Sequence, residues 1–300
     1  MKNKILVSAA IIGSLWILSL VTSFFLSLPT ASALDMSDGN TALIPITGVI
    51  SSFDSGGVFG DDTITSDELI ELIDKADSNP SIKAIIFDIN SPGGTPVATD
   101  EIAQRIKELK KPNVAVIREI GTSGAYWIAS SCDYIIANRM SMTGSIGVYG
   151  SFLQYSELLE RFNVSYERLV AGKYKDIGTP FKNMTGEERT LYQAMLNKLH
   201  YFFIQEVAQN RNLTVEKTRE LATGMIYLGI EAKELGLVDE LGNKDTAKAY
   251  LKNRLNETIR ITSYKKEPSF FEILSSLSLQ KLPLEKILGS KSSFPMVARV

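Results

Sequence analysis

Residues 121–127 (GTSGAYW) contain a side chain that could do covalent chemistry. Ser123 stands between small residues, at the point where an apolar run ending near Ile117 gives way to a second segment beginning at Ile128. A serine at a strand-to-helix turn has an accessible hydroxyl and lies in the partial positive field of a helix N-terminus. The pattern favours a nucleophile, although a Ser-Gly pair by itself more often only caps a helix.

A serine hydroxyl needs a base to accept its proton at neutral pH. The single histidine, His200, lies inside a predicted long helix and away from the turns that end sheet strands, which argues against a Ser-His-Asp triad. The other common solution is a lysine that burial keeps neutral. Lys173 and Lys175 both follow a glycine turn, and the residues alone do not choose between them.

Acyl transfer at a serine also needs backbone donors for the oxyanion of the tetrahedral intermediate. Residues 91–94 (SPGG) directly follow a buried apolar run, and their glycines can turn a peptide N–H towards the space above a sheet. A plain Pro-Gly turn is the alternative interpretation.

Strands and helices must position these segments, and the sequence predicts a set of both. Apolar runs typical of buried strands alternate with amphipathic helical patterns, which indicates an α/β fold with a mainly parallel sheet and its chemistry at the C-terminal ends of the strands. The predicted strands are 42–50, 82–89, 114–117 and 133–137, with 164–170 extended. The predicted helices are 65–78, 97–109, 123–130, 152–162, 185–210, 215–222 and 230–235.

The N-terminal region predicts a membrane anchor. Residues 5–28 contain no charge and follow Lys2 and Lys4, and as a helix they would be long enough to cross a bilayer. The positive-inside rule then leaves the N-terminus in the cytoplasm and the catalytic body extracytoplasmic. A cleaved signal peptide is the alternative, since residues 31–33 (ASA) offer a cleavage site.

The predicted organisation is an anchor or signal segment with its linker at 1–34, a catalytic domain at 35–265 and an amphipathic tail at 266–300. The net charge of −2 argues against nucleic-acid binding through a basic surface. The lone Cys132 excludes an intrachain disulfide framework and a cysteine-rich metal site, so neither a metal nor another cofactor is expected.

Four motifs in order resemble the signal peptide peptidase SppA family. They are SPGG at 91–94, SGAYW at 123–127, TGSIGV at 143–148 and GKYKDIGTP at 172–180. The resemblance covers residues 42–241 and implies a Clp protease/crotonase-like fold.

The resemblance also implies the roles of single residues. Ser123 would be the nucleophile, Lys175 the general base, and Ser145 would hold the lysine in place. The oxyanion hole would be formed by the backbone N–H groups of Gly94 and Gly124. Two departures from the family pattern are Ala125 in place of a second glycine and Asn90 in place of an acidic residue, and neither removes a reacting group.

The function expected from the resemblance is a membrane-anchored serine endopeptidase that degrades remnant signal peptides and other apolar peptides, assembled as a homo-oligomeric ring with composite sites. Three alternatives remain open. They are a stomatin-partnered peptidase of narrow specificity, a non-catalytic membrane scaffold of the same fold, and a crotonase-like enzyme acting on acyl-CoA, which the extracytoplasmic placement argues against.

Overall fold

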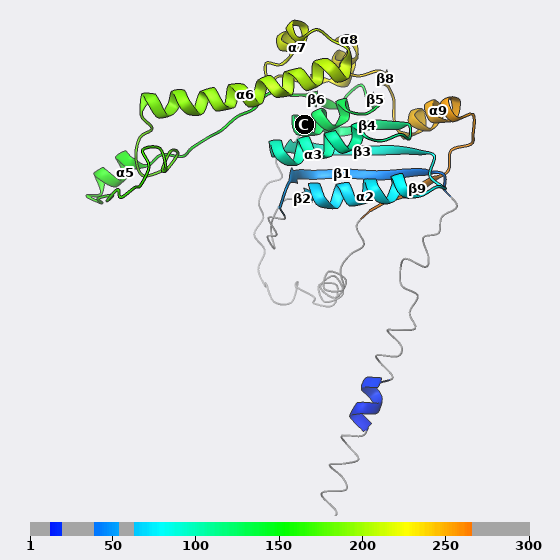
Figure 1. The fold of residues 1–300 in the computed structure, drawn as a ribbon, viewed down its shortest axis with the longest axis horizontal. Helices are drawn as coiled ribbons and strands as arrows, with labels where there is room; N and C mark the ends of the chain where they lie inside the picture. Colours follow the sequence, from blue (N-terminus) through cyan, green and yellow to red (C-terminus); the bar gives the residue numbers. More distant parts are fainter. Residues whose placement is uncertain (1–12, 20–38, 54–62, 266–300) are drawn as a thin grey trace, which may run out of the picture. The chain divides into compact units, whose positions relative to one another are not determined.

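A nine-stranded sheet organises the computed structural model, which describes residues 13–19, 39–53 and 63–265 (Figure 1). Its main path runs β2-β1-β3-β4-β5-β8, while β9 pairs with β1 and β6 pairs with β4 and β7. All described pairs are parallel except β6 with β7. The strands are β1 (Thr41–Ser51), β2 (Thr63–Thr65), β3 (Ala84–Gly94), β4 (Asn113–Thr122), β5 (Tyr134–Ala137), β6 (Met142–Gly144), β7 (Ile226–Leu228), β8 (Glu240–Leu241) and β9 (Ile261–Ser263).

Helices connect the strands, and α2 and α6 are among those that begin at capping boxes. Thr65 with Glu68 opens α2, and Thr185 with Glu188 opens α6, so both helices start where side chains satisfy their first backbone N–H groups. The helices of the sheet-bearing part are α2 (Ser66–Ser78), α3 (Pro96–Lys107), α4 (Gly124–Ser130), α5 (Ser156–Arg161), α6 (Gly186–Arg211), α7 (Val215–Leu221), α8 (Gly229–Glu234) and α9 (Lys244–Leu255).

The sheet is buried on both faces. Successive side chains of a strand point to opposite sides, so Ile85, Phe87 and Ile89 of β3 join one core cluster, to which α2, α3 and α4 contribute. Ala84 and Ile86 join a second cluster on the other face, with Ala247 and Leu251 of α9. Both faces of β3 therefore exclude water, as its continuous apolar run predicts.

The predicted mainly parallel sheet flanked by helices is confirmed, and the finer Clp protease/crotonase-like assignment stays a prediction. The strands differ from expectation at their C-terminal ends. β3 continues through Ser91–Gly94, and β4 continues to Thr122, where its last residues pair with β6 rather than β5. Apolar character ends earlier than the hydrogen-bonded ladder, so hydropathy alone underestimates both strands.

Residues 149–185 form a segment that we call the arm. Figure 1 shows it at the N-terminal end of α6, away from the sheet. Only α5 is helical there, shorter than the predicted helix 152–162, and residues 164–170 belong to no strand. Many apolar side chains of the arm are exposed, including Tyr149, Leu153, Phe162 and Leu169.

The predicted anchor and tail fall mainly or wholly outside the described residues. Of the anchor at 5–28, residues 13–19 are described and are helical; the tail at 266–300 lies outside entirely. Within the described ranges, the structure contains no helix with the length and apolarity needed to span a bilayer.

A buried hydrogen bond offers a test of how α4 is held. Tyr126 is fully buried, its hydroxyl donates to the Leu237 carbonyl at 2.9 Å, and burial raises its pKa. Tyr126→Phe leaves that carbonyl without its donor, so we expect the free energy of unfolding to fall by about 1–3 kcal/mol in urea denaturation. Tyr201→Phe, at an exposed position, is the control and should change little. Equal values for the two variants would contradict this role of Tyr126.

Candidate active site

Ser123 occupies a strained turn between β4 and α4. Its φ of 53° and ψ of −125° lie in a region that residues with side chains rarely adopt. Two backbone hydrogen bonds hold it there: Ser123 N donates to Gly144 O at 2.8 Å, and Trp127 N donates to Ser123 O at 3.0 Å. A serine on such a sharp strand-to-helix turn has the geometry of a nucleophile elbow.

Two glycines, Gly93 and Gly124, allow close packing around this serine. A methyl group on Gly93, whose φ is 101°, would lie 2.7 Å from Gly124 N and 3.0 Å from Ser123 Cβ. One on Gly124 would lie 2.4 Å from Thr99 Oγ1 and 3.2 Å from Gly94 N. Only glycine fits these positions without displacement of neighbouring atoms.

The same packing places two candidate oxyanion donors together. Gly94 N lies beside Gly124, and both residues line the cavity that Ser123 also lines. Gly124 is the first residue of α4, so its N–H has no acceptor within the helix. The structure therefore brings Ser123, Gly94 and Gly124 to one wall of a cavity, an arrangement suited to an anionic tetrahedral intermediate.

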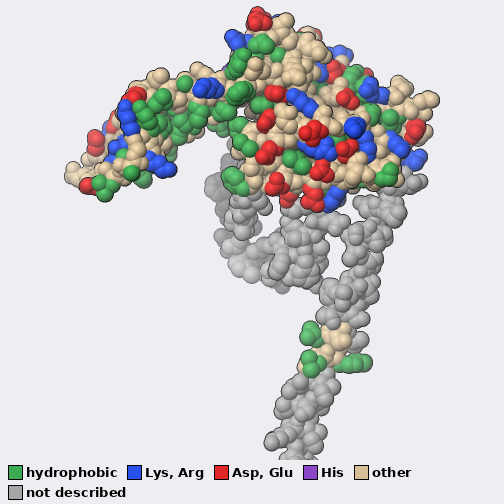
Figure 2. Space-filling model, viewed as in Figure 1, with side chains coloured by type: hydrophobic (Ala, Val, Ile, Leu, Met, Phe, Trp, Pro, Cys, Tyr) green, Lys and Arg blue, Asp and Glu red, His purple; other side chains and the backbone are tan. Residues whose placement is uncertain are grey.

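The cavity beside Ser123 has a volume of about 630 Å³ and a mainly apolar lining. Its floor includes Trp127, whose ring stacks on Phe203 of α6 with centroids 4.8 Å apart. Figure 2 shows hydrophobic side chains gathered along α6 and the arm. The α6 side chains that line the cavity include Tyr192, Met195, Leu196, Leu199, Phe202 and Phe203.

These α6 residues were not predicted from the sequence, although a signal for them exists. Their spacing of three and four residues marks one face of a helix. Such a stripe would normally be assigned to the core, yet Met195 and Phe202 are exposed. The stripe packs on α4 at Phe203, and only the fold shows that it borders the serine.

Ser145 lies next to the candidate nucleophile. Thr122 and Gly144 are partners in the pairing of β4 with β6, so Ser123 and Ser145 are the residues that follow two neighbouring strands. Ser145 also has a positive φ, of 50°, and its N–H donates to Met225 O at 2.8 Å. The structure thus brings Ser145 to the neighbourhood of Ser123, as a supporting role requires.

Lys175 lies on the arm and does not line the cavity beside Ser123. It is exposed on the arm, whose Lys173 contacts Glu187 in the first turn of α6. The structure of the single chain therefore does not place the Lys175 side chain at the cavity that contains Ser123.

The two candidate lysines differ in their surroundings. Lys173 Nζ donates to both carboxylate oxygens of Glu187, at 2.7 and 2.8 Å, and these bonds raise its pKa to about 12. Among the described residues, Lys175 Nζ makes no ion pair. A lysine held in its charged form is a poor base, so the geometry disfavours Lys173.

Neither the histidine nor the cysteine belongs to the site. His200 lies on α6 but is absent from the cavity lining. Burial raises the pKa of the Cys132 thiol well above its ordinary value, which leaves it unreactive. Among the described residues, no group of three or more His, Cys, Asp or Glu side chains could hold a metal ion.

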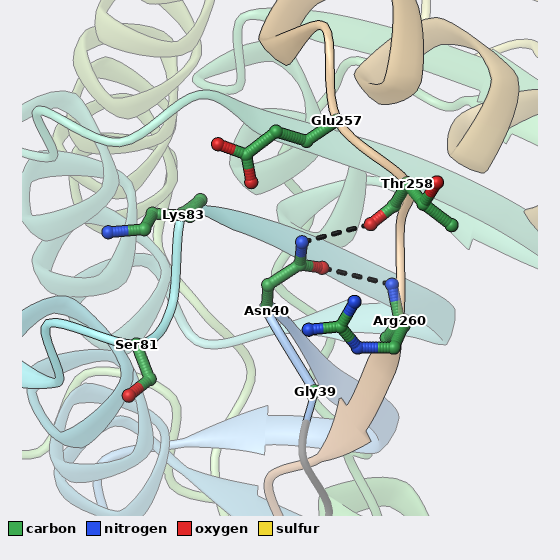
Figure 3. Close-up of a pocket in the computed structure, with 7 residues that line it drawn as sticks. All are labelled: Gly39, Asn40, Ser81, Lys83, Glu257, Thr258 and Arg260. Carbon is green, nitrogen blue, oxygen red and sulfur yellow. Dashed lines mark hydrogen bonds between the residues drawn. The ribbon is translucent and has the colours of Figure 1, made fainter.

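A second, polar pocket lies at the opposite ends of the strands, beside Asn40 and the start of β3 (Figure 3). It contains a serine and a lysine, Ser81 and Lys83, but their side chains point in different directions in Figure 3. Lys83 Nζ donates to the Pro80 carbonyl at 2.9 Å. Ligands of parallel α/β sheets bind at the carboxyl ends of the strands, where Ser123 lies, so this pocket is the weaker candidate.

Comparison with known proteins identifies the family of this chain. The model of peptidase family S49 matches residues 105–258, which include Ser123, Ser145 and Lys175. A candidate signal peptide peptidase SppA of Enterococcus faecium is 30% identical over 232 residues, covering 76% of this chain and 67% of that protein. The chain belongs to peptidase family S49.

Other relatives are named as proteases. A candidate protease of Methanocaldococcus jannaschii is 37% identical over 202 residues, and the match covers 67% of this chain and 65% of that protein, just under two thirds of its length. Among solved structures, a mutant of the 1510-N membrane-bound stomatin-specific protease has a TM-score of 0.49 and 16% identity, covering 77% of this chain and 100% of the other. A match at that score carries no information about the site.

The glycine packing predicts a specific sensitivity of this S49 site. A methyl group on Gly94 would lie 1.8 Å from Ile50 O, so Gly94→Ala must displace backbone beside Ser123. We expect labelling of Ser123 by a fluorophosphonate probe to fall at least about tenfold, since one oxyanion donor is worth that much or more. Gly186→Ala is the matched control, because its added methyl group would meet nothing within 4 Å. Unchanged labelling in a folded Gly94→Ala variant would show that Gly94 is not part of the oxyanion hole.

Proposed function

We propose that this S49 protein is a membrane-anchored serine endopeptidase that cleaves apolar peptides, with Ser123 as nucleophile and Lys175 as general base. One observation carries the proposal: Ser123 lies on a strained turn at the wall of an apolar cavity, beside the backbone N–H groups of two glycines. Family membership supports the reaction class.

The proposed reaction is acyl transfer through a covalent intermediate. Ser123 Oγ attacks the substrate carbonyl carbon while its proton passes to neutral Lys175 Nζ. The N–H groups of Gly94 and Gly124 stabilise the oxyanion, the C–N bond then breaks, and Lys175 gives the proton to the leaving amine. Water attacks the acyl-enzyme, loses a proton to Lys175, and the Ser123 oxygen leaves with that proton.

We propose that the lysine comes from a second copy of the chain. Among the described residues, no lysine lines the cavity that contains Ser123. Lys175 belongs to the arm, which Figure 1 shows at the N-terminal end of α6. The exposed apolar side chains of the arm support self-association, since contiguous exposed apolar surface marks interaction sites. An assembly could also bury Lys175, and burial favours the neutral form of an amine, which is the form that acts as a base.

The lining of the cavity supports an apolar substrate. Its α6 wall presents Met195, Leu199 and Phe202, which favour aliphatic or aromatic side chains over charged ones. A relative named as a signal peptide peptidase agrees with substrates derived from signal peptides. The charge-free segment at 5–28 supports an anchor that holds the site at the extracytoplasmic face of the membrane.

The first experiment compares the full-length, detergent-solubilised wild type with Ser123→Ala and Lys175→Ala on an apolar signal-peptide fragment, with products analysed by mass spectrometry. We expect cleavage and an acyl adduct on Ser123 in the wild type, and a loss of at least about a thousandfold in each variant. Wild-type activity in either variant would overturn the assignment of that residue. An unlabelled, inactive wild type would indicate a scaffold.

The origin of the lysine has its own test. Ser123→Ala and Lys175→Ala are each inactive alone, but an assembly mixed from both contains some sites with an intact serine from one chain and an intact lysine from another. We therefore expect co-expression to restore cleavage to a substantial fraction of the wild-type rate. Mixed assemblies that stay inactive, with mixing verified by two affinity tags, would show that both residues act within one chain.

Apolar selection is tested by one change in the α6 wall. Leu199→Glu places a carboxylate among apolar side chains, and we expect kcat/KM for a substrate with leucine before the cleaved bond to fall about tenfold or more. Leu191→Glu, on an exposed position of the same helix that does not line the cavity, is the matched control. Equal effects of the two substitutions would contradict a specificity role for the cavity.

A further inference from the structure

The turn that carries Lys175 is short and closed by its own backbone. Gly172, with a φ of 102°, starts it, and Lys175 N donates to Gly172 O at 3.1 Å. Thr179 N donates to Asp176 O at 3.1 Å just beyond. Lys175 is exposed on this turn, so backbone contacts alone do not fix the direction of its side chain. That direction depends on how the turn is attached to the rest of the arm.

An arginine fixes the residue that directly follows Lys175. Arg168 Nε and Nη2 donate to the two carboxylate oxygens of Asp176, at 2.6 and 2.8 Å, and Nη2 also lies 3.4 Å from Lys173 O. A two-pronged arginine–carboxylate pair sets orientation as well as distance. The Arg168 guanidinium also holds the pKa of Asp176 below its ordinary value, so the pair stays charged at neutral pH.

The same carboxylate connects the turn to α6. Lys182 Nζ lies 3.8 Å from Asp176 and 2.5 Å from Glu188. Glu188 is 4% exposed and accepts from Thr185 N at 2.9 Å in the capping box of α6. The series Arg168–Asp176–Lys182–Glu188 thus runs from the Lys175 turn to the first turn of α6, the helix that lines the Ser123 cavity from Tyr192 onward.

A second, more exposed attachment lies on the other side of Lys175. Lys173 and Tyr174 both donate to the Glu187 carboxylate, and the Lys173 ammonium lies 4.9 Å from the Tyr174 ring centroid. Lys173 and Tyr174, before Lys175, therefore contact Glu187 directly, and Asp176, after it, is linked to Glu188 through Lys182. The Lys175 side chain takes no part in these contacts.

We infer that Arg168 and Asp176 are positioning residues, which tether the Lys175 turn to the first turn of α6 and so fix the direction in which the base is presented. This inference rests on the proposed function, in which Lys175 is the base. Neither residue contacts the reacting atoms; both act through Lys175. Surface ion pairs contribute little to stability, which makes a role in geometry the better explanation of a four-member series whose central carboxylate is 12% exposed.

The physical reason is the sensitivity of proton transfer to geometry. The base must come within hydrogen-bond reach of Ser123 Oγ, and a displacement of about 1 Å can lower a rate about a hundredfold. If Lys175 is supplied across an interface between copies, an error in the arm would move it relative to a serine fixed in the sheet.

The experiment measures kcat, KM and the pH–rate profile of the assembled full-length protein with an apolar fluorogenic peptide. The variants are Arg168→Met, Arg168→Lys and Asp176→Asn, with Lys175→Ala alongside. Glu220→Gln, in the exposed Lys217–Glu220 pair of α7, is the matched ion-pair control. We expect Arg168→Met and Asp176→Asn to lower kcat about tenfold or more with KM within twofold, Arg168→Lys to recover part of the loss, and Glu220→Gln to match the wild type.

The pH profile separates positioning from general damage to the fold. Activity rises with pH as the base loses its proton. The charged groups on the arm and the first turn of α6 around Lys175 are Arg168, Lys173, Asp176, Lys182, Glu187 and Glu188. Arg168→Met leaves a negative Asp176 beside Lys175, which favours the charged lysine, so the acidic limb of the pH–rate profile moves to higher pH. Asp176→Asn leaves a positive Arg168 there, which favours the neutral lysine, so this limb moves to lower pH.

The outcomes are distinct. Wild-type activity in Lys175→Ala would overturn the proposed function itself. An inactive Lys175→Ala together with wild-type kcat and unshifted limbs in Arg168→Met and Asp176→Asn would overturn only the positioning inference. Size-exclusion profiles and thermal unfolding, matched to the wild type, show that the variants assemble and fold. A raised KM with unchanged kcat would assign the pair to substrate binding and would also overturn the inference.

Discussion

The close approach of backbone around Ser123 is the constraint on which the rest of the structure depends. A residue with a side chain is held at positive φ, and it stays there because two neighbouring strands and a helix meet at that point. The turn is closed by the Gly144 carbonyl on one side and crowded by Gly93 and Gly124 on the other. The sheet is buried on both faces, and its rigidity holds Ser123 in this strained backbone conformation.

Different parts of α6 make different contacts. From Tyr192 onward the helix lines the cavity, and at Phe203 it packs on Trp127 of α4, while its first turn holds the arm through Glu187 and Glu188. One helix therefore connects the cavity wall with the arm that carries the candidate base. In an assembly, that connection would let the position of the arm depend on the same helix that lines the cavity beside Ser123.

The sequence predicted the framework where hydropathy and local chemistry coincide. The buried runs of β1, β3 and β5 and the capping boxes of α2 and α6 were assigned from short-range patterns that the structure retains. The weak elements β6, β7 and β8 were not predicted, because two or three residues leave no periodicity to detect. Their place is set by pairing, and β6 is the strand that puts Ser145 beside Ser123.

By itself, the sequence determined the α/β class and the small set of residues that could do serine chemistry, since motif and spacing are local properties of the chain. Only the tertiary structure decided how those residues are grouped. It joined Gly94, Gly124 and Ser123 at one cavity, placed Ser145 after the strand that neighbours β4, added the α6 wall, and left Lys175 on the arm, outside the cavity lining. The reason is physical: which strand ends become neighbours, and how far a helix carries a loop away from them, depends on long-range packing that no local pattern encodes.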